Sequence, residues 1–198
     1  MTKNLVIFGR QGAGKGTQSQ RIVDALGVVH VSTGDMLRAA IAAETELGLA
    51  AQKIMDAGGL VDDVTMIGIV SERLNEQDIV TNGVLLDGFP RTTAQADELA
   101  RILAKRSISA AINLEVSVEE VTARMLARGR DDDTPEAIAK RLNLYESATR
   151  PVLDWFEQRG LLLEVDGLGA EDEVFARVHA ALETAIPDEE VGTGDNGE

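Results

Sequence analysis

Short apolar segments alternate along the chain with longer stretches that carry apolar residues at helical spacing. Apolar runs without strict alternation are typical of strands buried on both faces, and a helix after each run implies a parallel sheet. The pattern therefore predicts a doubly wound α/β fold, with helices on both faces of a five-stranded parallel sheet. The five predicted strands are residues 5–8, 28–32, 83–87, 110–116 and 161–165.

Two of the predicted helices have clear start signals. Ser117 and Glu120 have the spacing of a capping box, in which each side chain bonds the backbone N–H of the other. Thr134, Pro135 and Glu136 supply in order a cap, a first-turn proline and an acid that favours the positive end of the helix dipole. Helices are therefore expected to begin after Ser117 and after Thr134.

About fifty residues separate the second predicted strand from the third, which is more than one crossover helix needs. Helical patterns at 36–44, 47–57 and 64–74 predict an inserted helical subdomain. At the other end of the chain, residues 187–198 hold five acidic residues and no basic one. Such a segment cannot bury enough apolar surface to fold, so we expect a disordered acidic tail after one folded domain at 1–186.

The chain has 198 residues, no cysteine and a formal net charge of −15 at pH 7. A strongly acidic protein repels nucleic acids and anionic membrane surfaces, so neither is an expected partner. No apolar stretch approaches the roughly 18 residues of a membrane span, and the first residues do not resemble a secretory signal. We expect a cytoplasmic protein. The missing cysteines exclude disulfides and thiolate zinc sites.

A glycine-rich segment, GRQGAGKGT at 9–17, lies between the first predicted strand and a helical stretch. It matches G-x-x-x-x-G-K, whose glycines let backbone N–H groups approach phosphate oxygens while the following helix adds its dipole. Lys15 supplies a mobile positive charge. The general pattern has Ser or Thr directly after the lysine, whereas here Gly16 intervenes before Thr17. The loop predicts nucleotide binding rather than a plain turn, but it does not specify a reaction.

Four motifs occur along the chain in a fixed order: GKGTQ at 14–18, STGDMLR at 32–38, LDGFPRTTAQA at 86–96 and RGRDDDTPEAIAKRL at 128–142. Together they resemble the adenylate kinase family of nucleoside monophosphate kinases, from residue 5 to about residue 167. The resemblance implies reversible, Mg²⁺-dependent transfer of a phosphoryl group from ATP to AMP, giving two ADP. It also implies a P-loop three-layer fold and a monomer.

Phosphoryl transfer needs converging cations more than a covalent nucleophile, because negative charge spreads over the phosphate oxygens in transit. Arginine suits this role, since its planar guanidinium binds two oxygens at once and keeps its charge. Any one arginine alone is better explained as a surface charge, but four motifs together favour a site. The residues implied to act on the transferring group are Lys15, Arg91, Arg128, Arg130 and Arg141.

The resemblance divides the remaining site residues between the two nucleotides. Those implied for ATP are Gly12, Ala13, Gly14, Lys15, Gly16, Thr17, Arg124, Arg128 and Gly169. Those implied for AMP are Thr33, Leu37, Arg38, Gly59, Val61, Gly88, Arg91, Gln95, Arg130 and Arg141. Arg124 would stack on the ATP adenine, its alternative being a salt bridge with Glu120. Asp87 would hold Mg²⁺ through water.

The acceptor base is assigned through Gln95, whose amide can both donate to and accept from an adenine edge. Val61 would present its backbone to the purine. The resemblance also implies a cis bond before Pro90, in the turn that carries Arg91. Pyrimidine-specific relatives usually differ at Thr33 and Gln95, so AMP is favoured over UMP or CMP as the acceptor.

Only Gly129 separates Arg128 from Arg130, so the resemblance implies a short lid at 128–134 and an AMP-binding insertion at 32–61. The short lid leaves no room for the β insertion that some relatives brace with zinc, and we expect no zinc. Asp132 and Asp133 match the acidic pair that orders the lid arginines, and Asp131 is expected to be solvated. The chain departs from the family at Gln11 and Asp62, where proline is common.

Two other functions stay open at this point. A UMP/CMP kinase would use the same fold, and a nucleotide-sensing protein would bind without turnover, although the complete arginine set argues against a sensor. His30 and His179 have no metal-ligand partner at suitable spacing, and we expect both to be structural or on the surface.

Overall fold

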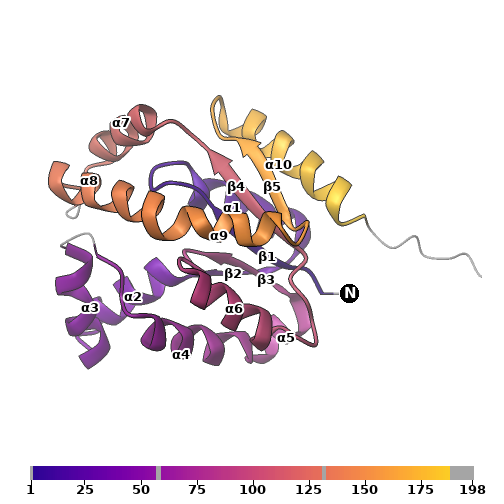
Figure 1. Ribbon diagram of the computed structural model, residues 1–198, viewed down its shortest axis with the longest axis horizontal. Coiled ribbons are helices and arrows are strands. Elements are labelled where there is room, and N and C mark those ends of the chain that lie inside the picture. Colours follow the sequence, from indigo (N-terminus) through magenta and orange to yellow (C-terminus); the bar gives the residue numbers. More distant parts are fainter. Residues whose placement is uncertain (1, 57–58, 131–132, 188–198) are drawn as a thin grey trace, which may run out of the picture.

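The computed structural model describes residues 2–56, 59–130 and 133–187. One parallel sheet with the strand order β2-β3-β1-β4-β5 lies at its centre (Figure 1), which confirms the predicted fold class. Each strand begins and ends within one residue of its predicted bounds. The strands are β1 (Asn4–Phe8), β2 (Val29–Ser32), β3 (Val84–Asp87), β4 (Ala110–Glu115) and β5 (Leu162–Asp166).

Helices fill the connections between these strands. They are α1 (Lys15–Leu26), α2 (Thr33–Ala42), α3 (Glu46–Asp56), α4 (Asp63–Leu74), α5 (Gln77–Asn82), α6 (Thr93–Ile102), α7 (Val118–Arg128), α8 (Pro135–Leu144), α9 (Arg150–Glu157) and α10 (Glu171–Ala185). A π-helical turn, η1 (Tyr145–Thr149), joins α8 to α9 in one long helical rod. The six-residue α5 was not predicted, because it is too short to establish a helical period.

Two apolar layers hold the helices to the sheet, because successive side chains of a strand point to opposite faces. In β1, Val6 and Phe8 join the layer beneath α4, α5, α6 and α9, whereas Leu5 and Ile7 join the layer beneath α1, α7 and α10. Figure 1 shows α7 and α10 above the sheet in this view and α4 and α6 below it. Both faces of the sheet are therefore covered, as continuous apolar strands require.

The predicted helix starts are found at both positions. Ser117 Oγ accepts from the backbone N–H of Glu120 at 3.3 Å, and Thr134 Oγ1 accepts from that of Ala137 at 3.2 Å. The carboxylate of Glu120, however, accepts from Arg124 Nε at 2.7 Å. The helix after Ser117 is thus capped by its serine, while Glu120 has a different partner from the one a capping box requires.

The region between β2 and β3 divides into two parts. Helices α2 and α3 lie against each other at one end of the molecule (Figure 1), where they form the inserted helical pair. Helix α4 instead contributes Met66, Val70 and Leu74 to the apolar layer under the sheet. The insertion is joined to the core at its first and last residues, close to the ends of β2 and β3, and Leu37 and Ala51 of the helical pair belong to the same apolar cluster.

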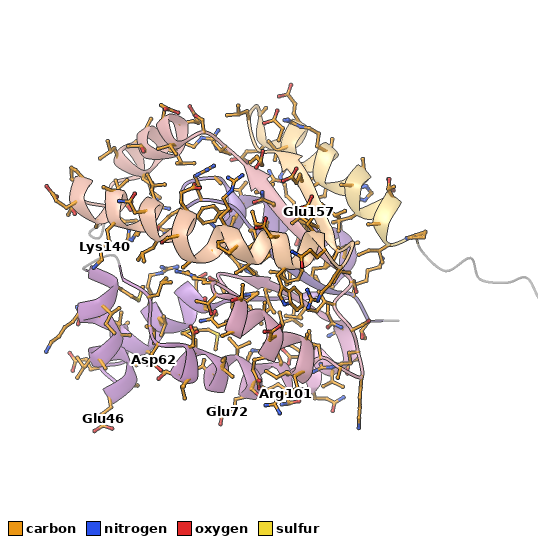
Figure 2. All side chains as sticks on the ribbon, in the orientation of Figure 1. Glu46, Asp62, Glu72, Arg101, Lys140 and Glu157 are labelled. Atoms are coloured by element: carbon orange, nitrogen blue, oxygen red, sulfur yellow. The ribbon has the colours of Figure 1, made fainter. Side chains whose placement is uncertain are left out.

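Many charged side chains lie on the outside of the molecule. Figure 2 shows Glu46, Glu72, Lys140 and Glu157 on the outer surfaces of four different helices, and all four are exposed. Within the described ranges, none of the helices is long and apolar enough to cross a membrane.

The sheet register brings three connections together at one edge. Asp87, the last residue of β3, lies opposite Ile7 of β1 on one side and Ser32 of β2 on the other. The loop after β1, the start of α2 and the turn after β3 therefore leave the sheet side by side. This edge, at the carboxyl ends of the strands, is where open α/β sheets bind ligands.

Candidate active site

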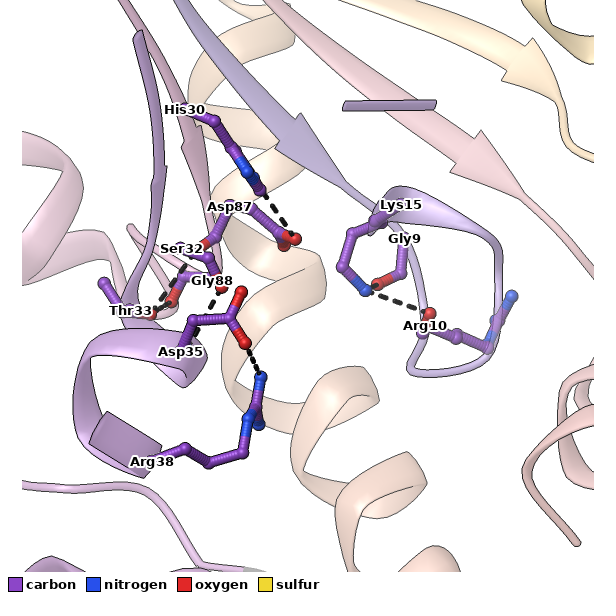
Figure 3. Close-up of polar contacts among 10 residues, drawn as sticks. All are labelled: Gly9, Arg10, Lys15, His30, Ser32, Thr33, Asp35, Arg38, Asp87 and Gly88. Atoms are coloured by element: carbon purple, nitrogen blue, oxygen red, sulfur yellow. Dashed lines mark hydrogen bonds and ion pairs between the residues drawn. The ribbon is translucent and has the colours of Figure 1, made fainter. Parts of the chain in front are cut away.

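The glycine-rich loop connects β1 to α1 and wraps around the side chain of its own lysine. Lys15 Nζ donates to the backbone carbonyls of Gly9 at 2.9 Å and Arg10 at 3.2 Å (Figure 3). Gly12 has φ +89, and a Cβ there would lie 2.8 Å from the carbonyl oxygen of Val121. Only glycine fits this position, so the loop can lie close against α7, and its residues Gly12 and Gly14 line the cavity.

An arginine inside the loop ties it to two other elements. Arg10 donates to Glu146 Oε1 from Nε at 2.9 Å and from Nη2 at 2.5 Å, and its Nη1 donates to the carbonyl of Val116 at 2.9 Å. Glu146 lies in η1 and Val116 follows β4. The fork thus braces the phosphate-binding loop against the helical rod. Sequence reasoning missed this role, because the loop pattern allows any residue at position 10 and Glu146 is 136 residues away.

The turn after β3 is built around Gly88. Its carbonyl accepts from Thr33 Oγ1 at 3.0 Å and from Arg91 Nε at 2.7 Å. Gly88 has φ +84, and a Cβ there would lie 2.7 Å from Thr33 Oγ1 and 2.9 Å from Arg91 Nη2. The peptide bond between Phe89 and Pro90 is cis, as the family resemblance implied. The start of α2 and the guanidinium of Arg91 are therefore held by one carbonyl.

One cavity of about 580 Å³ opens between these elements. Among the described residues that line it, seven are basic and two, Asp35 and Asp87, are acidic. The basic residues are Lys15, Arg38, Arg91, Arg124, Arg128, Arg130 and Arg141. In a protein with a net charge of −15, such a concentration of positive charge marks the cavity as a binding site for an anion.

The pKa shifts of two of these side chains show that gathering the cations in one cavity is electrostatically unfavourable. Burial lowers the pKa of the Lys15 ammonium from its ordinary value, and although Asp87 opposes that shift, Arg91 and Arg128 add to it. Burial likewise lowers the pKa of Arg91, against the opposing effect of Asp87. The positive charges repel one another in a partly desolvated space, and a bound anion would relieve that repulsion.

A single buried carboxylate organises the arginines on the lid side. The Asp133 side chain is 0% exposed, and it accepts from Arg128 Nε and Nη2 at 3.0 and 2.9 Å and from Arg141 Nη1 at 3.4 Å. The backbone N–H of Arg130 bonds the same carboxylate at 3.2 Å. Asp133 therefore orders the arginines as expected. Asp131 and Asp132 lie outside the described residues.

Arg141 also reaches across the cavity. Its Nη2 donates to the backbone carbonyl of Met55 at 3.3 Å, at the end of α3. Figure 1 shows α8, which carries Arg141, and α3 at the same end of the molecule. The guanidinium therefore connects the lid side to the inserted helical pair.

Most residues that the sequence assigned to a site line this one cavity. Besides the seven basic residues, those that do are Gly12, Gly14, Gly16, Thr17, Thr33, Leu37, Gly59, Val61, Asp87, Gly88 and Gln95. Two predicted ATP-binding residues do not line it. Ala13 is a buried residue of the loop itself, and Gly169 lies in the connection between β5 and α10. Their roles in ATP binding stay predictions.

Two further arginines of the cavity, besides those that Asp133 holds, are paired with carboxylates. Arg124 Nε bonds Glu120 Oε1 at 2.7 Å, which was the alternative to a role in ATP binding. Arg38 Nη2 bonds the carboxylate of Asp35, a partner that the sequence did not indicate (Figure 3). Both pairs are on solvent-accessible helix surfaces, where such pairs are weak and readily exchanged for a phosphate.

The two histidines differ in position. His30 lines the cavity, with Nε2 4.0 Å from Asp87 Oδ2 (Figure 3), whereas His179 lies on α10 beside Glu183. In the described part of the chain, no group of three or more histidine, aspartate or glutamate side chains has the geometry of a metal site. His30 was expected to be structural, and its place beside Asp87 could not be read from the sequence.

The fold and the cavity define the chain as a P-loop nucleotide-binding protein whose site is built for phosphate chemistry. A family model described as adenylate kinase matches residues 7–161. An adenylate kinase of Stenotrophomonas maltophilia strain K279a is 47% identical over 184 residues, which cover 90% of this chain and 98% of that protein. Adenylate kinases of Xanthomonas campestris pv. campestris strain 8004 and Xylella fastidiosa strain M12 are each 45% identical with the same coverage.

The chain belongs to the adenylate kinase family. This confirms the family that the four sequence motifs indicated, and with it the enzyme class, a kinase.

Asp133→Asn should destabilise the protein in a pH-dependent way. The hydrogen bonds from Arg128 and from the backbone of Arg130 outweigh burial and hold the pKa of Asp133 below its ordinary value. The carboxylate therefore stabilises the fold above the ordinary aspartate pKa, and that contribution disappears as the pH falls through the lowered value. We expect a loss of about 1 to 3 kcal/mol at pH 7 and a smaller difference below about pH 4.

Urea unfolding of both proteins at pH 7 and pH 3.5 measures this effect. The control is Asp154→Asn, which changes an exposed aspartate on α9 and should be neutral at both pH values. Equal stability of Asp133→Asn and wild type at pH 7 would show that the buried carboxylate is not what holds the lid arginines.

Proposed function

We propose that the cavity converts ATP and AMP into two ADP, and that the seven basic residues around it supply most of the catalytic effect. The observation that carries this proposal is their convergence from three separate parts of the chain, the phosphate-binding loop, the acceptor side and the lid, on one space. A phosphoryl group between two nucleotides needs such an arrangement, because its charge must be met from several directions.

The donor phosphates occupy the loop between β1 and α1. Backbone N–H groups from Gly12 to Thr17 face them, and the first turn of α1 adds the positive end of its dipole. Lys15 then exchanges the carbonyls of Gly9 and Arg10 for phosphate oxygens. Its lowered pKa reflects the burial and the neighbouring cations that a bound phosphate offsets.

The acceptor occupies the side formed by β2, α2 and the turn after β3. Arg38 and Arg91 bind its phosphate, with Arg38 giving up its bond to Asp35. Thr33, Val61 and the buried amide of Gln95 surround its adenine. The guanidinium of Arg91, anchored by Gly88, lies between the two phosphates and is the acceptor ligand that also serves the transfer.

The transfer itself depends on position and charge. Arg128, Arg130 and Arg141 approach the migrating phosphoryl group from the lid side, where Asp133 bonds the guanidinium groups of Arg128 and Arg141 and the backbone N–H of Arg130. Closure of the lid at 128–134 and of the insertion at 32–61 excludes water, which would otherwise accept the phosphoryl group and hydrolyse ATP.

Mg²⁺ enters with ATP, and Asp87 is the residue that would hold it through water. Apart from its contact with His30 at 4.0 Å, the Asp87 carboxylate has no hydrogen-bond partner among the described side chains, so its oxygens can accept from the water shell of a cation. Mg²⁺ keeps several waters when it binds proteins, and it would neutralise charge on the phosphate oxygens. The Asp87 carboxylate therefore fits a hydrated Mg²⁺ ion. No zinc is proposed, since the chain has no cysteine and the lid is short.

ATP, AMP and ADP are the proposed ligands, and a monomer is sufficient for the reaction, because every assigned residue comes from one chain.

A panel of acceptors tests the assignment of AMP. With ATP as donor, the wild type should prefer AMP to CMP and UMP by roughly ten- to a hundredfold in kcat/KM, because a wrong base leaves the buried amide of Gln95 unpaired. In Gln95→Leu that preference should shrink, with the KM for ATP unchanged. Equal use of CMP or UMP by the wild type would favour a pyrimidine nucleotide kinase.

Lys15→Met should lower kcat more than about a hundredfold while leaving the melting temperature within a few degrees of wild type. The methionine removes a charge that stabilises the transition state and nearly preserves the volume of the side chain. Lys105→Met, at an exposed position outside the cavity, is the matched control and should keep full activity. Near-normal turnover in folded Lys15→Met would remove this residue from the mechanism.

Asp87→Asn should raise the Mg²⁺ concentration required for half-maximal activity by about tenfold or more, since an amide binds a hydrated cation more weakly than a carboxylate. A Mg²⁺ titration at fixed ATP and AMP, with Asp154→Asn as control, makes the measurement. An unchanged Mg²⁺ requirement in Asp87→Asn would assign the cation to other ligands.

A further inference from the structure

The amide of Gln95 is held at both ends by groups of opposite character. Its Oε1 accepts from the backbone N–H of Arg91 at 2.7 Å, and its Nε2 donates to Asp63 Oδ1 at 2.7 Å. Gln95 is 3% exposed and lines the cavity. The two contacts use one acceptor site of the oxygen and one N–H, so one more of each remains for a ligand.

Asp63 belongs to a different part of the chain from the amide that it holds. It is the first residue of α4, directly after the inserted helical pair, whereas Gln95 lies in the first turn of α6. The second carboxylate oxygen of Asp63 accepts from Thr92 Oγ1 at 2.9 Å. Thr92 is itself the cap of α6 and accepts from the backbone N–H of Gln95 at 3.2 Å. Asp63 thus bonds both the side chain and the cap that position Gln95.

This arrangement permits only one orientation of the amide. A carboxylate only accepts hydrogen bonds, and a backbone N–H only donates them. If the amide turned over, its oxygen would face the carboxylate of Asp63 and its NH₂ group would face the N–H of Arg91. Both contacts would become repulsive in a buried place, where unsatisfied polar groups are costly.

We propose that Asp63 is a positioning residue that determines the choice of purine, by fixing the Gln95 amide in the sense that matches a 6-aminopurine. The proposal rests on the proposed binding of the acceptor base at Gln95. Adenine offers an amino donor at position 6 and an acceptor at N1, which the remaining oxygen site and N–H of the amide complement. A 6-oxopurine such as hypoxanthine offers the reverse pattern, an oxygen at position 6 and an N–H at N1.

An unrestrained amide would serve either base, because turning it over exchanges donor and acceptor. A restrained one rejects the oxopurine although the two bases have nearly the same shape. Discrimination between AMP and inosine monophosphate, IMP, therefore reports the restraint directly. A purely structural contribution of Asp63 would lower the use of both acceptors by the same factor.

The test measures kcat/KM for AMP and for IMP, with ATP as donor, in wild type, Asp63→Ala, Asp63→Asn and Asp62→Asn. The wild type should prefer AMP by at least tenfold. Asp63→Ala removes both acceptor oxygens and leaves the backbone N–H of Arg91 as the remaining restraint on the amide, so it should reduce the AMP/IMP ratio about fivefold, with the KM for ATP unchanged. The asparagine of Asp63→Asn can hydrogen-bond to the Gln95 amide in either orientation of that amide, so this variant should reduce the AMP/IMP ratio about threefold.

Asp62→Asn is the matched control, since it makes the same chemical change one residue earlier. Asp62, labelled in Figure 2 at the start of α4, accepts from the backbone N–H and the hydroxyl of Thr65, at 3.0 and 2.7 Å, and an asparagine also caps helices well. Its AMP/IMP ratio should equal that of the wild type. Thermal unfolding of each variant establishes which of them are folded.

The AMP/IMP ratio of Gln95→Leu separates failure of this inference from failure of the proposed function. If Gln95→Leu keeps the wild-type ratio, the base does not pair with this amide, and the assignment of the acceptor site falls with the inference. If Gln95→Leu loses the preference while Asp63→Ala stays within twofold of the wild-type ratio, only the role of Asp63 is overturned. Should Asp63→Ala fail to fold, Asp63→Asn decides by the same twofold limit.

Discussion

Mutual repulsion among like charges is the constraint that the rest of this structure has to meet. Seven basic side chains surround one cavity, and burial lowers the pKa of both Lys15 and Arg91. The repulsion can be sustained only if the backbone that carries these side chains is rigid and if a few carboxylates hold the cations until phosphate arrives. The parallel sheet supplies the rigidity, because its register places three of the supporting connections side by side.

The carboxylates in and around the cavity differ in how firmly they hold their partners. Asp133 is fully buried and bonds the lid arginines through both oxygens, so it sets their geometry. Asp35 holds Arg38 at a solvent-accessible position, where the pair can be exchanged for a phosphate at little cost. In the part of the chain that the structure describes, Asp87 is paired with His30 rather than with an arginine, which suits it to a hydrated cation. The same functional group therefore serves three purposes, according to burial and partner.

The sequence predicts the sheet, the loop and the basic residues because each is a local pattern: apolar runs, glycine spacing and short motifs. The contacts of Arg10 with Glu146 and of Gln95 with Asp63 could not be predicted, because they join residues 136 and 32 positions apart and depend on how helices cross. Motif similarity also assigned Gly169 to ATP, although Gly169 does not line the cavity. Resemblance thus located the charges and the carboxylate of Asp133, while the structure was needed to find the long-range contacts of Arg10 and Gln95.

The hydrogen bond from Arg141 to the carbonyl of Met55 affects how the binding of one nucleotide changes the affinity for the other. It gives the lid side and the inserted helical pair a shared contact, so a displacement of either segment changes the energy of the other. Under the proposed closure, a nucleotide that closes one segment also supplies part of the free energy needed to close the second. The affinities for donor and acceptor are then linked, and linkage of this kind is reciprocal. Cooperativity between two different ligands can in this way arise within a single chain, without subunits.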